Sequence, residues 1–304
     1  MKRFISLNGK YPRSEALIRA TRDHERGRIG KEELEKAYGA DYDRLKSIQT
    51  GFSMVSDGLL NWQDIVRPFA YLVKEAQVGG LVRYFETNTF YRKIHFRDTT
   101  IRNDLDRWAS EYFRFGNLAI LPSPYTLSRF SEGISISRAG ELIAAAVEYL
   151  RSNGYNYFFL QEPAIVYYED TASLEDLGRA LRSISRKAGD AMVSLNTYFA
   201  DASPLIRDLL RMPVSAVGVD FTFTDIESLM EAGWNSDKGL VAGILDTQNS
   251  LMETEAVLSP VMEKIETGLR PMFLIYTGSS DFEFLPSSVA DRKVEILRNL
   301  GGEI

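Results

Sequence analysis

Four carboxylate residues stand at equivalent places in this 304-residue sequence, each at the end of a short apolar run. They are Asp57, Glu162, Asp220 and Asp246. Amide and hydroxyl residues take the same place in the series, namely Gln161, Asn196 and Ser280. Carboxylates that are removed from water can act as general acids or bases. The set predicts a pocket that binds a polar substrate, for instance one that carries an amino group.

A plainer interpretation competes at each single position, because the ends of strands are solvated and need residues that form turns. For any one residue this plainer interpretation is favoured. The set as a whole favours a site, since the four carboxylates follow four different apolar runs.

Eight apolar runs can carry these residues as strands, and segments with helical periodicity separate them. The expected strands are Arg3–Leu7, Phe52–Val55, Leu118–Leu121, Tyr157–Gln161, Met192–Leu195, Ala216–Val219, Leu240–Leu245 and Pro271–Ile275. Such alternation predicts a parallel sheet with helical crossovers. At this length it favours an α/β fold of the (β/α)8 barrel type, a TIM barrel, as a single domain over residues 1–304. The first strand lacks a following Gly-x-Gly-x-x-Gly, which weakens a dinucleotide-binding alternative.

The stretch between the second and third expected strands is unusually long. A helix is expected from about Asn61 to Glu75 and another over Arg102–Phe115. Between them, residues 81–100 mix aromatic and polar side chains, which predicts a β-rich insertion. Further along, helices are expected at Arg138–Ser152, Leu174–Lys187, Pro204–Arg211, Asp225–Ala232, Glu253–Thr267 and Ser287–Leu300.

Composition excludes several kinds of site. The chain has no cysteine, which excludes disulfides, thiolate catalysis and cysteine-ligated metals. Its two histidines, His24 and His95, are too few for a histidine-rich metal site. A catalytic base at His95 is conceivable, but a structural or exposed role is favoured. The aromatic residues Tyr84, Phe85, Phe90 and Tyr91 could stack on a planar ligand such as a pterin, but core packing of the insertion is favoured.

Charge and hydropathy narrow the class of partner. The net charge of −6 argues against nucleic acid and anionic membranes as main partners. No apolar run approaches the ~18 residues of a membrane span, and the basic N-terminus lacks the apolar region of a signal peptide. We therefore expect a cytoplasmic protein.

Several motifs, taken in order, resemble the cobalamin-independent methionine synthases. Gln161-Glu162-Pro163-Ala164 is similar to that family's Asp-Glu-Pro-Ala motif, and the Lys10-containing segment 9–13 to its Gly-Ser-Phe-Pro segment. Segments 56–69, 122–126 and 280–286 also resemble family segments. The family has two (β/α)8 barrels, of which the N-terminal one is non-catalytic and the C-terminal one binds zinc. Residues 83–91 and 197–199 look like segments of the N-terminal barrel.

The resemblance also shows where the zinc chemistry is lost. The places of the family's zinc ligands hold Asn196, Tyr198, Asp220 and Ser280, of which only Asp220 is an ordinary zinc ligand. Zinc activates the homocysteine thiol in this family. The resemblance therefore implies that the chain binds no metal or cofactor of its own, and that zinc enters only with a partner chain.

The leading hypothesis is the N-terminal-type subunit of a split methionine synthase. It would work with a separate zinc-bearing catalytic barrel in methyl transfer to homocysteine from a methylated folate or corrinoid donor. Candidates for substrate binding are Lys10, Asp57, Gln161, Glu162, Asn196, Asp220, Asp246 and Ser280. Two alternatives stay open. One is an independent methyltransferase or decarboxylase of the wider superfamily, which includes uroporphyrinogen decarboxylase. The other is a non-catalytic binding or scaffold barrel.

Overall fold

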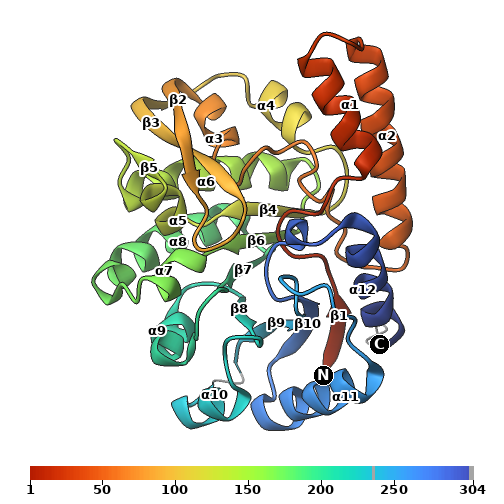
Figure 1. Ribbon diagram of the computed structural model, residues 1–304. Coiled ribbons are helices and arrows are strands. Elements are labelled where there is room, and N and C mark those ends of the chain that lie inside the picture. Colours follow the sequence, from red (N-terminus) through yellow and green to blue (C-terminus); the bar gives the residue numbers. More distant parts are fainter. Residues whose placement is uncertain (235–236, 301–304) are drawn as a thin grey trace.

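A parallel sheet of seven strands forms the centre of the computed structural model, which describes residues 1–234 and 237–300. The strands lie in the order β1-β10-β9-β8-β7-β6-β4 (Figure 1). They are β1 (Lys2–Ile5), β10 (Phe273–Gly278), β9 (Gly239–Leu245), β8 (Ala216–Asp220), β7 (Met192–Asn196), β6 (Tyr157–Gln161) and β4 (Leu118–Pro122). All pairs in this sheet are parallel. The chain thus has the α/β fold that its alternation predicts.

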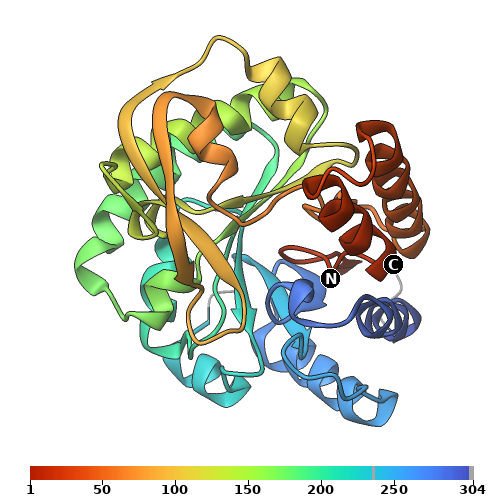
Figure 2. The ribbon, with the colours of Figure 1, turned by 45° about the horizontal axis from the view of Figure 1, so that its top comes forward.

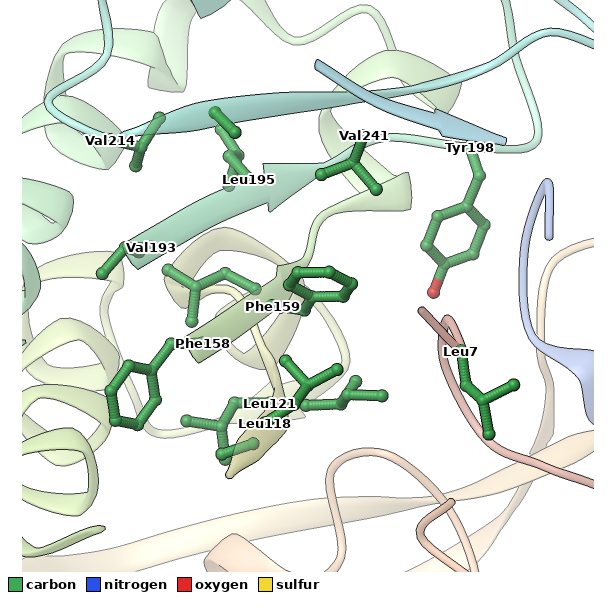
Figure 3. Packing of buried hydrophobic residues seen from close by; sticks show 14 of the residues in the cluster. Leu7, Leu118, Leu121, Phe158, Phe159, Val193, Leu195, Tyr198, Val214 and Val241 are labelled. Carbon is green, nitrogen blue, oxygen red and sulfur yellow. The ribbon is translucent and has the colours of Figure 1, made fainter. Parts of the chain in front are cut away.

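Both faces of the sheet are buried, which explains the continuous apolar runs. Every residue of β8 and β9 is buried. Inside the curved sheet, Phe159, Leu195 and Val241 belong to one apolar cluster (Figure 3). Helices cover the outer face because each has one apolar stripe.

The helices differ widely in length. The long ones are α1 (Glu15–Glu25), α2 (Lys31–Ile48), α6 (Ile136–Ser152), α8 (Leu174–Ala188), α11 (Glu255–Lys264) and α12 (Ser287–Leu300). The short ones are α3 (Pro68–Leu72), α4 (Leu105–Tyr112), α5 (Pro124–Arg129), α7 (Pro163–Tyr167), α9 (Ile206–Arg211) and α10 (Ile226–Ala232). Among the described residues, no helix is both long and apolar enough to cross a membrane.

The expected second strand, Phe52–Val55, is not a strand. Its backbone runs beside the start of β4, where the carbonyl of Val55 accepts hydrogen bonds from the N–H groups of Asn117 and Leu118 at 2.9 and 3.0 Å. The side chain of Asn117 accepts the N–H of Val55 at 2.8 Å. A side chain thus replaces part of the backbone ladder, so the structure shows a seven-stranded sheet instead of the closed eight-stranded barrel that we expected.

The insertion is longer than expected and lies across the end of the sheet. It is an antiparallel hairpin of β2 (Val73–Arg83) and β3 (Phe90–Ile101), extended by β5 (Ser131–Glu132) (Figure 2). The β-rich character is therefore confirmed, but the boundaries 81–100 are wrong, and of the helix expected from 61 to 75 only α3 (Pro68–Leu72) forms. Asp64 folds the start of that segment into a turn by accepting the N–H groups of Val66 and Arg67 at 3.1 and 2.7 Å.

Candidate site at the carboxyl ends of the strands

Three amide side chains meet at the carboxyl ends of the strands. The Oδ1 atom of Asn8 accepts hydrogen bonds from Nε2 of Gln161 at 2.9 Å and from Nδ2 of Asn196 at 3.2 Å. Asn8 in turn donates to the carbonyl of Gly278 at 3.4 Å. The parallel sheet thus gathers residues that are far apart in sequence, including two of the predicted site residues. We call Asn8, Gln161, Asn196 and Thr277 the amide cluster.

The amide cluster has spare capacity to accept hydrogen bonds. Oε1 of Gln161, Oδ1 of Asn196 and Oγ1 of Thr277 are buried and have no hydrogen-bond partner in the protein. The space beside Asn196 and Thr277 is closely packed and has no room for a water molecule. Each unpaired buried polar group costs about 1–3 kcal/mol. A ligand group that donates hydrogen bonds, such as an amino group, would stabilise these oxygens, but the side chains around them must first move apart to admit it.

Glu162 is buried and fully engaged. It accepts hydrogen bonds from Oγ1 of Thr126 at 2.6 Å, the N–H of Thr126 at 3.3 Å and the N–H of Ile165 at 3.2 Å, and also from the hydroxyl of Ser123. Burial raises the pKa of Glu162 to about 7, although these hydrogen bonds oppose the rise. The carboxyl group thereby joins the loop after β4 to the start of α7.

Asp220 and Asp57 also hold local turns. Asp220 accepts the N–H and hydroxyl of Thr222 at 2.9 and 2.6 Å and the N–H of Phe199 at 3.3 Å. Asp57 accepts the N–H groups of Leu59 and Arg114 at 3.0 and 2.9 Å. Burial raises the pKa of both carboxyl groups to about 6.

Asp246 and Ser280 lie farther along the same edge. The Oδ1 atom of Asp246 accepts the N–H of Gln248 at 2.9 Å. The hydroxyl of Ser280 lies 2.7 Å from that of Thr247. Of the eight predicted residues, the structure therefore joins Gln161 and Asn196 through their common partner Asn8. It gives separate local partners to Asp57, Glu162, Asp220, Asp246 and Ser280.

Lys10 contacts the carboxylate of Asp281, a residue that is not among the candidates from the sequence. The N–H of Lys10 donates to Oδ1 of Asp281 at 2.7 Å, and its Nζ lies 2.7 Å from Oε2 of Glu283. Asp281 is buried, and burial followed by the charge of Glu283 raises its pKa to about 7. Its position in the sequence could have identified Asp281 as a candidate, because it directly follows Ser280 after the last strand.

The tip of the β2–β3 hairpin seals this edge of the sheet. The hydroxyl of Tyr84 lies 3.0 Å from that of Tyr198, which donates to Oδ2 of Asp281 at 3.4 Å. Figure 3 shows the hydroxyl of Tyr198 directed toward the segment that carries Leu7. Phe85 has a left-handed backbone (φ 51°) and packs against Phe199 with ring centroids 5.3 Å apart. Tyr84 is buried, in line with core packing of the insertion.

A second hollow lies beside the hairpin tip. Its empty volume is about 350 Å³, and it is lined by Lys10, Trp62, Asp64, Tyr84, Tyr91, Asp281 and Glu283, among others. Aromatic rings and charged groups therefore face each other in one place, around a space that has room for about one water molecule.

The residues at the zinc-ligand places do not fit zinc. Asn196 donates to Asn8, Tyr198 to Asp281, and Ser280 pairs with Thr247. The carboxylate of Asp220 is taken by Thr222 and by the backbone of Phe199. Within residues 1–234 and 237–300, no three His, Asp or Glu side chains are placed to hold a metal ion.

The buried carboxyl groups predict an unusual pH dependence of stability. The folded pKa values of Asp57, Glu162, Asp220 and Asp281, about 6 to 7, lie above their ordinary values. The folded state therefore holds more protons between about pH 4 and 7, so the free energy of unfolding falls as pH rises through that window. The fall is on the order of 1 kcal/mol per pH unit for each titrating group. Urea unfolding should show higher stability at about pH 5 than at about pH 8, with a smaller difference in Glu162→Gln. Equal stability at both pH values would contradict this.

Removing one hydroxyl should loosen the hairpin tip. In Tyr198→Phe, Asp281 loses a donor and Tyr84 loses its partner, at a cost of about 1–3 kcal/mol. We expect faster hydrogen–deuterium exchange over residues 81–91, measured by mass spectrometry. Tyr149→Phe is the matched control, because the Tyr149 hydroxyl bonds Asp106 on the molecule's surface. Identical exchange in the two variants would show that the hydroxyl chain does not hold the tip.

The sequence of this chain is similar to those of known proteins. The family model described as cobalamin-independent synthase, N-terminal domain, matches residues 73–268. The 5-methyltetrahydropteroyltriglutamate–homocysteine methyltransferase of Bacillus subtilis (strain 168) is 29% identical over 232 residues, which cover 68% of this chain and 30% of that protein. The methionine synthase of Pyrococcus furiosus is 21% identical, with 95% of this chain and 89% of that protein covered.

Solved structures share the fold. A B12-independent methionine synthase from Shewanella sp. W3-18-1 in complex with selenomethionine matches with a TM-score of 0.75 at 14% identity, over 98% of this chain and 96% of that one. A putative vitamin-B12 independent methionine synthase from Listeria monocytogenes matches with a TM-score of 0.68 at 14% identity, over 99% of this chain and 98% of that one. The chain spans only about 30% of the Bacillus methyltransferases that it matches. Because the family model covers well over half of its length, the chain belongs to the cobalamin-independent synthase family, in the N-terminal domain type.

Proposed function

We propose that this chain is the N-terminal-type barrel of a methionine synthase system and works with a separate zinc-bearing catalytic barrel. The system would transfer a methyl group from a methylated folate or corrinoid donor to homocysteine. One observation carries the proposal: in a member of this family, the zinc-ligand places hold Asn196, Tyr198 and Ser280, and none of these is a His, Cys, Asp or Glu residue that ordinarily binds zinc. Activation of the homocysteine thiol is therefore assigned to the partner.

The position of residues 52–55 also agrees with a barrel-type subunit. We infer that residues 52–55 stand at the eighth position of a (β/α)8 arrangement, between β4 and β1. In support, Val55 bonds the start of β4, and β1 and β4 are the two outer strands of the sheet.

The contribution of this chain would be to bind the donor or to complete the mouth of the partner's active site. The hollow beside Lys10, Trp62 and Tyr84 combines rings and charges that suit the chemistry of a planar donor, and the hairpin tip would have to move away to admit one. The amide cluster offers acceptor oxygens for an amino group. Neither feature needs a nucleophile on this chain.

A second candidate is an independent methyltransferase or decarboxylase. It is favoured by the match to the Pyrococcus furiosus methionine synthase, which covers 89% of that protein. The buried carboxyl groups of Glu162 and Asp281, with pKa values of about 7, would supply acid and base chemistry near neutral pH.

Binding measurements separate these functions. Calorimetric titration of the chain with methyltetrahydrofolate, methylcobalamin and homocysteine should show binding of a methyl donor. Sedimentation velocity with a zinc-bearing catalytic barrel from the same source should show a complex. Lys10→Met should weaken donor binding about tenfold, because a charged hydrogen bond is worth about 1.5–3 kcal/mol. Arg19→Gln, at an exposed position on α1, is the control. Failure to bind any donor or the partner would favour the scaffold alternative and overturn the proposal.

A further inference from the structure

The tip of the β2–β3 hairpin, residues 81–91, covers ionisable side chains at the end of the sheet (Figure 2). The charged groups around the small space beneath it are Lys10, Asp64, Asp281 and Glu283. Asp281 is only 5% exposed and Lys10 only 8%. Removing a charged group from water costs free energy, so the closed position of the tip is sensitive to the charge that it covers.

A break in the hairpin ladder separates the tip from the rest of β2 and β3. The register of the two strands shifts between Val78 and Leu81, and Gly79 and Gly80 occupy the shift. At Gly80, the place of a Cβ atom has no neighbouring atom within 4 Å. Glycine adopts more backbone conformations than other residues. The break can therefore act as a hinge for the tip.

The hairpin is fastened on both sides of this hinge. On the side of the sheet, the carboxylate of Asp64 accepts the N–H of Arg92 at 3.1 Å. On the side of the tip, the hydroxyl of Tyr84 lies 3.0 Å from that of Tyr198, which donates to Asp281 at 3.4 Å. The polar link that holds the tip down thus ends on a carboxyl group.

Phe85 makes the apolar part of the closure. Its backbone is left-handed (φ 51°), a conformation that is strained for a residue with a side chain. Its ring packs against those of Phe130, Tyr167 and Phe199, with centroids 5.3, 4.7 and 5.3 Å apart. Release of the strain offsets part of the loss of these contacts when the tip moves away.

Asp281 has the least compensated charge beneath the tip. Nζ of Lys10 lies 2.7 Å from Glu283, and the guanidinium of Arg67 lies 2.8 Å from Asp64. Of the three carboxyl groups around this space, Asp281 alone makes no ion pair with a described residue. Loss of its proton therefore adds one negative charge that no cation of its own balances.

The other buried groups near the tip do not change charge at neutral pH. Burial and the charge of Asp281 raise the pKa of Tyr84 and of Tyr198 well above the ordinary value, and Glu283 and Glu162 add to the rise. Burial followed by the charge of Glu283 raises the pKa of Asp281 to about 7. Its ionisation therefore falls in a range of pH where both tyrosines stay neutral.

We propose that residues 81–91 form a lid that is hinged at Gly79 and Gly80 and opens when Asp281 loses its proton. Opening lets water reach the carboxylate, which lowers the cost of its charge. The closed lid binds the proton more tightly than the open lid does. The ratio of open to closed lid therefore rises with pH, from the ordinary range of an aspartate up to about 7, and then levels off. This inference needs no donor or partner chain and goes beyond the proposed function.

Two spin labels can measure this motion, because the chain has no cysteine of its own. Asn88→Cys places one label at the exposed tip, and Arg182→Cys places the other at an exposed position on α8. Pulsed electron resonance should show one distance between the labels at about pH 5 and a second population at about pH 8. The open-to-closed ratio should rise more than about tenfold, since one coupled proton changes it up to about tenfold per pH unit.

Variants in the labelled chain identify the group responsible. Asp281→Asn should remove the change with pH. Asp57→Asn is the matched control, because it also replaces a buried carboxyl group of raised pKa, and it should keep the change. Tyr198→Phe cuts the link to Asp281 and should enlarge the open population at about pH 5. Thermal unfolding verifies that each variant is folded at both pH values.

Three results would overturn the proposal. The first is a distance in the parent chain that is the same at both pH values. The second is a change with pH that persists in Asp281→Asn or disappears in Asp57→Asn. The third is a Tyr198→Phe variant whose label distances match those of the parent.

Discussion

Replacing Glu162 with alanine is expected to destabilise the protein by at least about 3 kcal/mol. Four donors, from Ser123, Thr126 and Ile165, would lose their common acceptor in a place that water does not reach. Each unsatisfied buried donor costs about 1–3 kcal/mol. Such a loss is a large part of the 5–15 kcal/mol that typically separates the folded and unfolded states.

Equilibrium urea unfolding, followed by circular dichroism, measures this effect. Glu148→Ala is the matched control, because Glu148 is exposed on α6 and pairs with the exposed Lys187. It should cost about 1 kcal/mol or less. Similar losses in the two variants would show that Glu162 is not the organising acceptor of this edge.

Replacing Lys293 with methionine is expected to cost about 3–5 kcal/mol. The side chain of Lys293 is fully buried, and its Nζ atom donates to Oε1 and Oε2 of Glu253 at 2.6 and 2.8 Å and to the carbonyl of Asp246 at 2.9 Å. The lysine therefore ties the loop after β9 to α12. Its removal leaves the carboxylate of Glu253 with an uncompensated charge, and removing one partner of a buried pair is the costly case.

The double variant Lys293→Met with Glu253→Gln gives the sharper test. Glutamine keeps an oxygen for the N–H of Asp246, which Oε1 of Glu253 accepts at 2.9 Å, and it removes the charge. The double variant should therefore recover part of the stability lost in Lys293→Met. If both variants unfold at the same urea concentration, the uncompensated charge is not the cause of the loss.

Most of the parallel sheet could be predicted from the sequence because its strands are apolar on both faces. The expected strand Tyr157–Gln161 coincides with β6, and the expected helix Arg138–Ser152 lies within α6. Both segments can be predicted from their own residues, because the local pattern of apolar residues shows which side chains are buried.

The segments that failed depend on residues outside them. Phe52 and Met54 are buried, as a strand would require, but the side chain of Asn117 takes the place of a ladder partner. The sequence of residues 52–55 does not itself predict that replacement. The sequence predicts helix as far as Glu75 because the apolar residues from Trp62 to Leu72 have helical spacing, but β2 begins at Val73.

The candidate site was predictable in position and not in detail. Strand ends identified Gln161 and Asn196, but their common partner is Asn8, from the other end of the chain. Asp281 contacts the backbone of Lys10 because Gly9 adopts a left-handed conformation (φ 59°), where a side chain would collide with Asp281. Such contacts arise only when distant segments meet.

The central claim is that this chain serves methyl transfer only together with a zinc-bearing barrel. Its most direct test is an assay of methionine formation from homocysteine and methyltetrahydrofolate or methylcobalamin, with each chain alone and with both together. We predict no turnover from this chain alone and turnover that depends on both chains. Methionine formation by this chain alone would contradict the account, and so would a catalytic barrel whose rate this chain leaves unchanged.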